Sequence, residues 1–182
     1  MSRAGAGVVV WVTGLPAAGK STLALRVHET LRAAGQACVL LDGDEVRGCL
    51  VPTPGYDEVA RSDFYESLAR LAALLARQGL VVLVAATAHR AIFRQRARLL
   101  APRFVEVLVQ TPAARCAERD PRQLWARARR GELTALPGAG VAYEPPEAPA
   151  IIAAGGLDDA ACAAIVAEVS RVETAGMRVA ST

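Results

Sequence analysis

The stretch Gly14-Leu15-Pro16-Ala17-Ala18-Gly19-Lys20-Ser21-Thr22 decides the fold. It matches G-x-x-x-x-G-K-[ST], the P-loop, in which backbone N–H groups and the lysine hold the phosphates of a nucleotide. Lys20 is the only lysine, since every other residue among the 21 Lys and Arg is an arginine. A compact ammonium can reach the β- and γ-phosphates, whereas a guanidinium is a planar fork. The stretch therefore predicts a nucleotide-binding loop in which Lys20 also serves catalysis.

The segments on either side of the loop are those that a P-loop requires. Residues 8–12 are valines and one tryptophan, which is typical of a buried parallel strand. Residues 22–33 have helical spacing, with Leu23, Val27 and Leu31 on one face and Gly35 just beyond the end. The loop would open a helix whose dipole favours phosphate. In such a loop the Ser21 hydroxyl is placed to bind Mg²⁺.

Apolar runs and amphipathic stretches alternate along the rest of the chain. This alternation predicts an α/β fold of the P-loop nucleoside-triphosphate-hydrolase type, a parallel sheet with helices on both faces. We see no repeat or linker and expect one domain over residues 1–182. In the helix expected at 63–77, the leucines at 68, 71, 74 and 75 should face the core. The other expected strands are 37–41, 80–86, 104–109 and 151–152, and the other helices are 91–100, 111–117, 123–130 and 157–172.

Composition excludes several classes of protein. The net charge is only +3, and the basic stretch 122–130 contains one aromatic residue, so we predict no nucleic-acid partner. The chain has no asparagine and therefore no N-K-x-D motif for reading guanine. We see no targeting segment and no membrane span, and expect a cytoplasmic protein. The cysteines have no C-x-x-C spacing and are expected to be buried and unpaired: Cys38, Cys49, Cys116 and Cys162.

Candidate catalytic residues follow the second expected strand. Asp42 and Asp44 flank Gly43 at the edge of the sheet that also carries the P-loop. Phosphoryl transfer needs a carboxylate to orient or deprotonate the attacking hydroxyl, and we assign this role to Asp44. Asp42 would support Mg²⁺ through water or cap the next turn. Ala86 and Thr87, at the end of the third strand, are expected to contact the substrate.

Arginines near the expected loops suit an anionic substrate, because they bind oxyanions through forked hydrogen bonds. The basic stretch and the Gly- and Pro-rich loop at 136–149 predict a mobile lid at about 120–145. Two histidines, His28 and His89, cannot form a metal cluster, although His89 stands at a strand tip where it could touch a ligand. The arginines concerned are Arg47, Arg61, Arg90, Arg119, Arg122, Arg127, Arg129 and Arg130.

Several motifs resemble, in their order, those of the adenylylsulfate (APS) kinases, which phosphorylate the 3′-hydroxyl of APS with MgATP to give PAPS. The resemblance runs from residue 8 to residue 149. It implies a P-loop kinase fold, ATP and Mg²⁺ as cofactors, a nucleotide substrate and a homodimer. Beyond the P-loop, the motifs are Leu-Asp-Gly-Asp-Glu-Val-Arg at 41–47, Arg-Asp-Pro-Arg at 119–122, Ala-Arg-Arg-Gly-Glu at 128–132 and Tyr-Glu-Pro-Pro-Glu at 143–147.

The resemblance also implies roles for single residues. Asp44 resembles the catalytic carboxylate of the family. Arg47 and Arg61 resemble the arginines that hold the phosphosulfate of APS. Tyr56 stands where the family has an aromatic ring that stacks on the substrate adenine, and Arg119 resembles a contact of the ATP adenine.

Departures from the family pattern fall mostly on the side of the acceptor substrate. Phe64 occupies a substrate-binding position at which the family usually has asparagine. Glu66 and Ser67 lie in a stretch where the family carries arginine. Residues 87–90 are Thr-Ala-His-Arg, where the family usually has Ser-Pro-aromatic-Arg. Arg122 replaces a lysine that the family has in the lid. Three readings follow: an APS kinase, a related phosphotransferase for another alcohol, or a non-catalytic nucleotide-binding module. The intact P-loop and D-G-D box argue against the last.

Overall fold

The computed structural model describes residues 6–179 and contains one sheet of parallel strands. The strand order is β2-β3-β1-β4-β5, so that β1 lies in the middle of the sheet. Pairing of Val8 with Val81 and of Val9 with Phe104 sets the register of β1 against both neighbours. The α/β prediction is confirmed, including the edge strand near residue 151. The strands are β1 (Val8–Gly14), β2 (Cys38–Asp42), β3 (Val81–Ala85), β4 (Phe104–Val109) and β5 (Ile151–Ala153).

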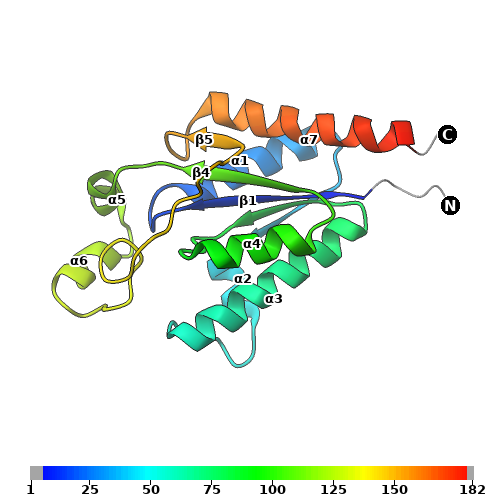
Figure 1. The fold of residues 1–182 in the computed structure, drawn as a ribbon. Coiled ribbons are helices and arrows are strands. Elements are labelled where there is room, and N and C mark those ends of the chain that lie inside the picture. Colours follow the sequence, from blue (N-terminus) through cyan, green and yellow to red (C-terminus); the bar gives the residue numbers. More distant parts are fainter. Residues whose placement is uncertain (1–5, 180–182) are drawn as a thin grey trace.

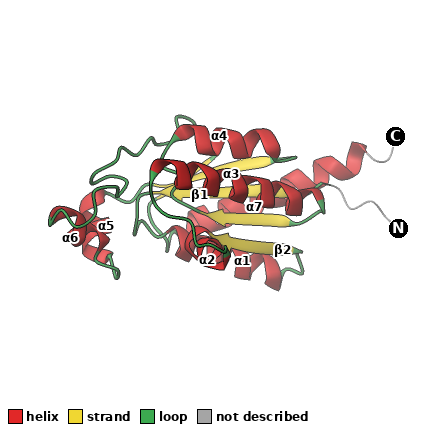
Figure 2. Ribbon diagram, turned by 90° about the horizontal axis from the view of Figure 1, so that it is seen from below, coloured by secondary structure: helices red, strands yellow, loops and turns green. Residues whose placement is uncertain are grey.

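Helices cover both faces of the sheet, as the alternating pattern predicted (Figure 1). Helices α1 and α7 lie on one face, and α3 and α4 lie on the other. Helices α5 and α6 project beyond the carboxyl ends of the strands (Figure 2). The helices are α1 (Lys20–Ala33), α2 (Gly43–Cys49), α3 (Glu58–Arg77), α4 (Ala91–Leu100), α5 (Ala113–Arg119), α6 (Leu124–Arg129) and α7 (Asp159–Val179).

The central strand divides the core into two halves, because its successive side chains point to opposite faces. Val10 and Val12 pack in the cluster that contains Leu23, Val27 and Leu31 of α1, the face predicted for that helix. Val9 and Trp11 pack in the other cluster, which contains residues of α3 and α4. Both faces of β1 are fully buried, so the strand is a rigid support for the loop that follows it.

Helix α3 differs from the prediction in where it begins and in which face is buried. It begins at Glu58, because the Asp57 carboxylate caps it by accepting the N–H of Ala60 at 2.9 Å. Leu71 and Leu74 are exposed, contrary to the predicted core face. Alanines make up half of the buried face, which consists of Arg61, Phe64, Tyr65, Leu68, Ala69, Ala72, Ala73 and Ala76. Helix α7 also extends further than predicted, to Val179.

The cysteine prediction is correct in part. All four cysteines are unpaired, and Cys116 and Cys162 are buried. Cys49 is exposed and Cys38 is half-buried, so the expectation of burial is wrong for these two. Among the helices within residues 6–179, none is long and apolar enough to cross a membrane.

Candidate active site

The loop between β1 and α1 presents backbone N–H groups at the carboxyl end of the central strand. Gly19 has a φ of 103°, and a Cβ at this position would lie 2.6 Å from the backbone nitrogen of Gly156. Only glycine therefore fits where the loop passes the segment after β5. Gly19 caps α1 without a side-chain hydrogen bond, which leaves the first N–H groups of the helix available to an anion. Residues 14–22 thus have the shape predicted for a phosphate-binding loop.

Lys20 is the first residue of α1, and its side chain folds back over the loop. Its Nζ donates to the carbonyl oxygen of Leu15 at 2.8 Å. Burial lowers the pKa of Lys20 from its ordinary 10.5 to about 8, although the carboxylates of Asp44 and Asp42 act against this change. The loop therefore holds the Lys20 ammonium in an environment that disfavours its charge. A polyphosphate would supply the negative charge that this ammonium lacks.

Residues 43–49 form helix α2, an element that the sequence analysis did not predict. The Asp42 carboxylate caps this helix, with Oδ1 accepting the N–H of Asp44 at 2.9 Å. The other oxygen of Asp42 accepts the hydroxyl of Ser21 and so ties α2 to the P-loop. Asp44 lies in the first turn of α2, and its side chain is 52% exposed. The two aspartates thus differ: Asp42 is bound to protein groups on both oxygens, whereas Asp44 remains accessible.

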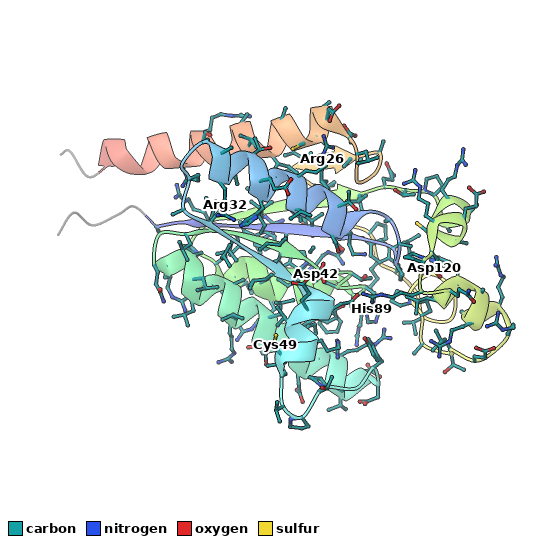
Figure 3. All side chains as sticks on the ribbon, turned by 180° about the vertical axis from the view of Figure 1, so that it is seen from behind. Arg26, Arg32, Asp42, Cys49, His89 and Asp120 are labelled. Carbon is teal, nitrogen blue, oxygen red and sulfur yellow. The ribbon has the colours of Figure 1, made fainter. Side chains whose placement is uncertain are left out.

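The segment that carries α5 and α6 rests on this site. Arg122 Nη1 donates to Asp44 Oδ2 at 2.5 Å. The indole Nε1 of Trp125 donates to the carbonyl oxygen of Pro16 at 3.1 Å. Asp120 accepts the backbone N–H of Trp125 at 2.8 Å and so fixes the start of α6. Figure 3 places Asp120 beside these projecting helices, with His89 and Asp42 at the end of the sheet.

Two arginines predicted to hold the acceptor substrate are nearly buried. Arg47 is 5% exposed and Arg61 is 8% exposed. Arg47 Nη1 donates to the carbonyl oxygens of Pro54 and Gly55, at 3.1 and 2.7 Å. Arg61 Nη2 donates to the carbonyl oxygen of Ala135. Burial lowers the pKa of Arg61, and the positive charge of Arg47 adds to this effect.

Aromatic rings surround these arginines. The guanidinium carbon of Arg47 lies 4.5 Å from the ring centroid of Tyr56 and 3.8 Å from that of Phe64. Tyr56 is 58% exposed, whereas Phe64 is only 3% exposed. The structure therefore revises the expected role of Phe64, because its ring lies beneath Arg47 rather than in the open site.

The tip after β3 is fixed by hydrogen bonds from three directions. Thr13 Oγ1 donates to the Thr87 carbonyl oxygen at 2.6 Å and is itself 3.1 Å from the hydroxyl of Tyr143. The N–H of Ala88 donates to the hydroxyl of Tyr65 at 3.0 Å, and Ala88 has a positive φ of 38°. Ala86, before the tip, is buried. Thr13, Tyr65 and Tyr143 were not predicted, and the Tyr-Glu motif at residue 143 was the only signal in the sequence.

His89 is buried beside this tip and lines a cavity of about 410 Å³ with Tyr56 and Arg61. Burial lowers the pKa of His89 to about 4, and the charge of Arg61 adds to this change. The imidazole is therefore neutral at physiological pH. His89, which the sequence places at a strand tip, thus shares a cavity with two residues predicted to bind the acceptor, and its contact with a ligand stays a prediction.

On the far side of the P-loop, Arg119 ends α5 next to the segment after β5. The Arg119 guanidinium lies close to Gly155, since a Cβ at residue 155 would be 3.6 Å from Arg119 Nη1. Thr111 links this region to the P-loop, since its Oγ1 donates to the carbonyl oxygen of Ala18 at 2.8 Å. Arg119 thus stands near the phosphate loop, on an element separate from α2. Thr111 and Gly155 were not predicted as parts of the site.

Comparison with known proteins assigns the family. The family model for adenylylsulphate kinase matches residues 6–154. The adenylyl-sulfate kinase of Enterobacter sp. (strain 638) is 43% identical over 147 residues, which cover 80% of this chain and 73% of that protein. The chain belongs to the adenylylsulphate kinase family. A second relative, the adenylyl-sulfate kinase of Paraburkholderia xenovorans (strain LB400), is 42% identical over 141 residues, covering 77% of this chain and 79% of the relative.

A solved member of the family has the same fold. The Mycobacterium tuberculosis APS kinase CysC, in complex with AMPPNP and APS, superposes with a TM-score of 0.83 at 34% identity. The match covers 91% of this chain and 98% of that one. The fold described above is therefore that of an adenylylsulphate kinase over nearly its full length.

Not every departure from the family pattern lies in the site. Glu66 pairs with Arg70 of its own helix at 2.6 Å and with Arg96 of α4 at 2.9 Å. It therefore joins α3 to α4 on the outer surface, and the adjacent Ser67 is exposed. Glu66 thus contributes to the packing of the two helices, and neither Glu66 nor Ser67 lines the cavity beside Arg61. Among the side chains that the structure describes, those of residues 6–171, no group of three or more His, Cys, Asp or Glu could hold a metal ion.

Proposed function

We propose that the protein transfers the γ-phosphoryl group of ATP to the 3′-hydroxyl of adenylylsulfate, giving ADP and 3′-phosphoadenylylsulfate. One observation carries the proposal: the short helix α2 bears both Asp44 and Arg47. Asp44 lies close enough to Lys20 to affect its pKa, and Arg47 lies among the aromatic rings with a nearly buried guanidinium. A carboxylate between a phosphate loop and an anion site is the arrangement that phosphoryl transfer to an anionic alcohol requires.

The donor side would bind ATP through residues 14–22. The N–H groups at the start of α1 would meet the phosphates, and the Lys20 ammonium would reach the β- and γ-phosphates. Arg119 would contact the adenine, which is consistent with its position beside Gly155. ATP would thus lie along the P-loop, with its γ-phosphate directed to Asp44.

The residues near the P-loop also fit Mg²⁺. Ser21 and Asp42 offer a hydroxyl and a carboxylate in contact with one another, and Mg²⁺ prefers oxygen ligands completed by water and substrate phosphates. Ser21 would bind the ion directly, with Asp42 behind it. When bound, Mg²⁺ neutralises charge on the transferring phosphate.

Asp44 would act at the acceptor hydroxyl. The 3′-oxygen would form a bond to the γ-phosphorus while the bond from phosphorus to the β–γ bridging oxygen breaks and ADP leaves. The hydroxyl proton would pass to Asp44, for which Arg122 would have to move away from Oδ2. Arg47 and Arg61 would hold the phosphosulfate, and Tyr56 would stack on the adenine. Ala86, Thr87 and Phe64 would complete this side, with Phe64 acting from beneath.

Incubation of the enzyme with MgATP and adenylylsulfate tests the proposal. We expect 3′-phosphoadenylylsulfate to form in equal amount to ADP, and adenosine 5′-phosphate to be a poor substitute for adenylylsulfate. Lys20→Ala and Asp44→Asn are the matched inactive controls. A folded protein that binds ATP yet forms no 3′-phosphoadenylylsulfate would refute the proposal.

We also propose a mobile lid at about residues 120–145 within a single domain, a homodimer and a cytoplasmic location. The lid contacts the P-loop through Trp125 and Asp44 through Arg122, so that its movement would open or close the proposed site. The exposed leucines at 71 and 74 of α3 are candidates for an interface between two copies. Light scattering with a Leu74→Gln variant tests the dimer, and a wild-type monomer would contradict it.

A further inference from the structure

Phe64 lies directly against the acceptor-side arginine Arg47. The distance from the guanidinium carbon to the ring centroid is 3.8 Å, which is well within the range of a cation–π contact. Phe64 is buried in the core on the α3 side of the sheet, with its ring centroid 5.4 Å from that of Tyr65. The ring is therefore a fixed support for Arg47.

Two further contacts restrict the guanidinium. The ring of Tyr56 lies 4.5 Å from it, and the carbonyl oxygens of Pro54 and Gly55 accept hydrogen bonds from Nη1. The two rings limit the tilt of the guanidinium plane, and the two carbonyls limit its rotation within that plane. Arg47 is thus held in one orientation before any ligand arrives.

One edge of this guanidinium has no protein partner. Among the side chains described within residues 6–171, the hydrogen bonds of Arg47 leave from Nη1 alone, no carboxylate pairs with Arg47 or Arg61, and Arg61 Nε is buried without a hydrogen-bond partner. Buried cations are costly unless an anion or hydrogen bonds compensate for them. The Nε–Nη2 edge of an arginine matches two oxygens of a phosphate or sulfate group. An oxyanion of a ligand would therefore suit this edge of Arg47.

We propose that Phe64 is a positioning residue, which holds Arg47 so that its Nε–Nη2 edge meets the phosphosulfate group of the acceptor nucleotide. The inference rests on the proposed function. The contact with the ring compensates for the water that burial removes from the guanidinium, and it orders a long side chain in advance of binding. At a position where the family pattern has a polar side chain, this chain thus uses an apolar ring that acts through an arginine.

The test is steady-state kinetics of Phe64→Leu and Phe64→Tyr beside the wild type. Leucine keeps the apolar volume but removes the π-face, whereas tyrosine keeps the ring. The matched control is Phe104→Leu, because Arg98 lies 4.7 Å from that ring at the opposite end of the sheet. Michaelis constants are measured for adenylylsulfate at saturating MgATP and for MgATP at saturating adenylylsulfate.

We expect Phe64→Leu to raise the KM for adenylylsulfate by about 10-fold, the size that a desolvated cation–π contact predicts. The kcat and the KM for MgATP should stay within about 2-fold, and Phe64→Tyr and Phe104→Leu should resemble the wild type. An unchanged KM for adenylylsulfate in Phe64→Leu overturns the inference, as does an equal rise of both KM values. A wild type that forms no 3′-phosphoadenylylsulfate overturns the proposed function as well, so the two failures are distinguishable.

Discussion

Replacing Lys20 by methionine should stabilise the empty protein while abolishing phosphoryl transfer. Methionine has a similar length and no charge, and burial of the ammonium in wild type lowers the pKa of Lys20 from 10.5 to about 8. At about 1.4 kcal/mol per pH unit, this difference sets an upper limit of about 3 kcal/mol for the cost of the charged form. The side chain is partly exposed, and methionine loses the hydrogen bond to Leu15, worth about 1 kcal/mol. We therefore expect a net stabilisation of about 1–2 kcal/mol at pH 7.

The dependence on pH identifies the ammonium as the cause. Between pH 8 and pH 10.5 the unfolded chain retains a proton on Lys20 that the folded chain has lost. The free energy of unfolding of the wild type therefore rises with pH across this window. The advantage of the methionine variant is complete below pH 8 and is lost as the pH approaches 10.5.

Urea denaturation of the two proteins at pH 7 and pH 9.5 measures this advantage, followed by circular dichroism without nucleotide. Subtracting one protein from the other at each pH removes the effect of every group that the two share. We expect the difference in unfolding free energy to shrink by about 1–2 kcal/mol between the two pH values. A difference that does not change with pH would refute the reasoning about Lys20.

Three further outcomes are expected. Asp44→Asn should lower kcat by about 10²- to 10⁴-fold with ATP affinity retained, measured by steady-state kinetics and calorimetry; an unchanged kcat would remove Asp44 as the base. Binding of ATP should change the tryptophan fluorescence of the protein, because the indole of Trp125 contacts the P-loop whereas Trp11 is fully buried. Trp125→Phe should therefore abolish the change in fluorescence. Glu106→Ala should lower the free energy of unfolding by about 3–5 kcal/mol because it leaves a buried arginine unpaired, whereas Glu118→Ala, in an exposed pair, should cost less than about 1 kcal/mol. Urea titration of both variants measures these losses. Equal losses of unfolding free energy in Glu106→Ala and Glu118→Ala would show that the burial of the Arg94–Glu106 pair does not matter.

The sequence predicts the donor half of the site better than the acceptor half, for a physical reason. A P-loop is a local structure, in which contiguous residues determine both the backbone path and the helix that follows. The anion site beside Arg47 depends on residues far apart in the chain, such as the contact of Arg61 with Ala135. The helical face of α3 was also misjudged, because leucine spacing indicates amphipathicity whereas the close approach to the sheet selects alanine. Helix α2 escaped prediction because D-G-D in isolation favours a turn.

The positions of the acceptor-side departures bear on the choice of acceptor substrate. Glu66 joins two helices on the surface, and Phe64 acts from beneath Arg47, so neither removes a cation from the anion site. At residue 87 the protein fixes the backbone carbonyl through Thr13, a contact that is independent of the side chain at that position. His89 is the departure that shares a cavity with Tyr56 and Arg61. Arg47 and Arg61, which we propose to hold the acceptor, are thus in place despite the departures at residues 64, 66 and 87, and we expect the departure at His89 to bear most on which nucleotide is accepted.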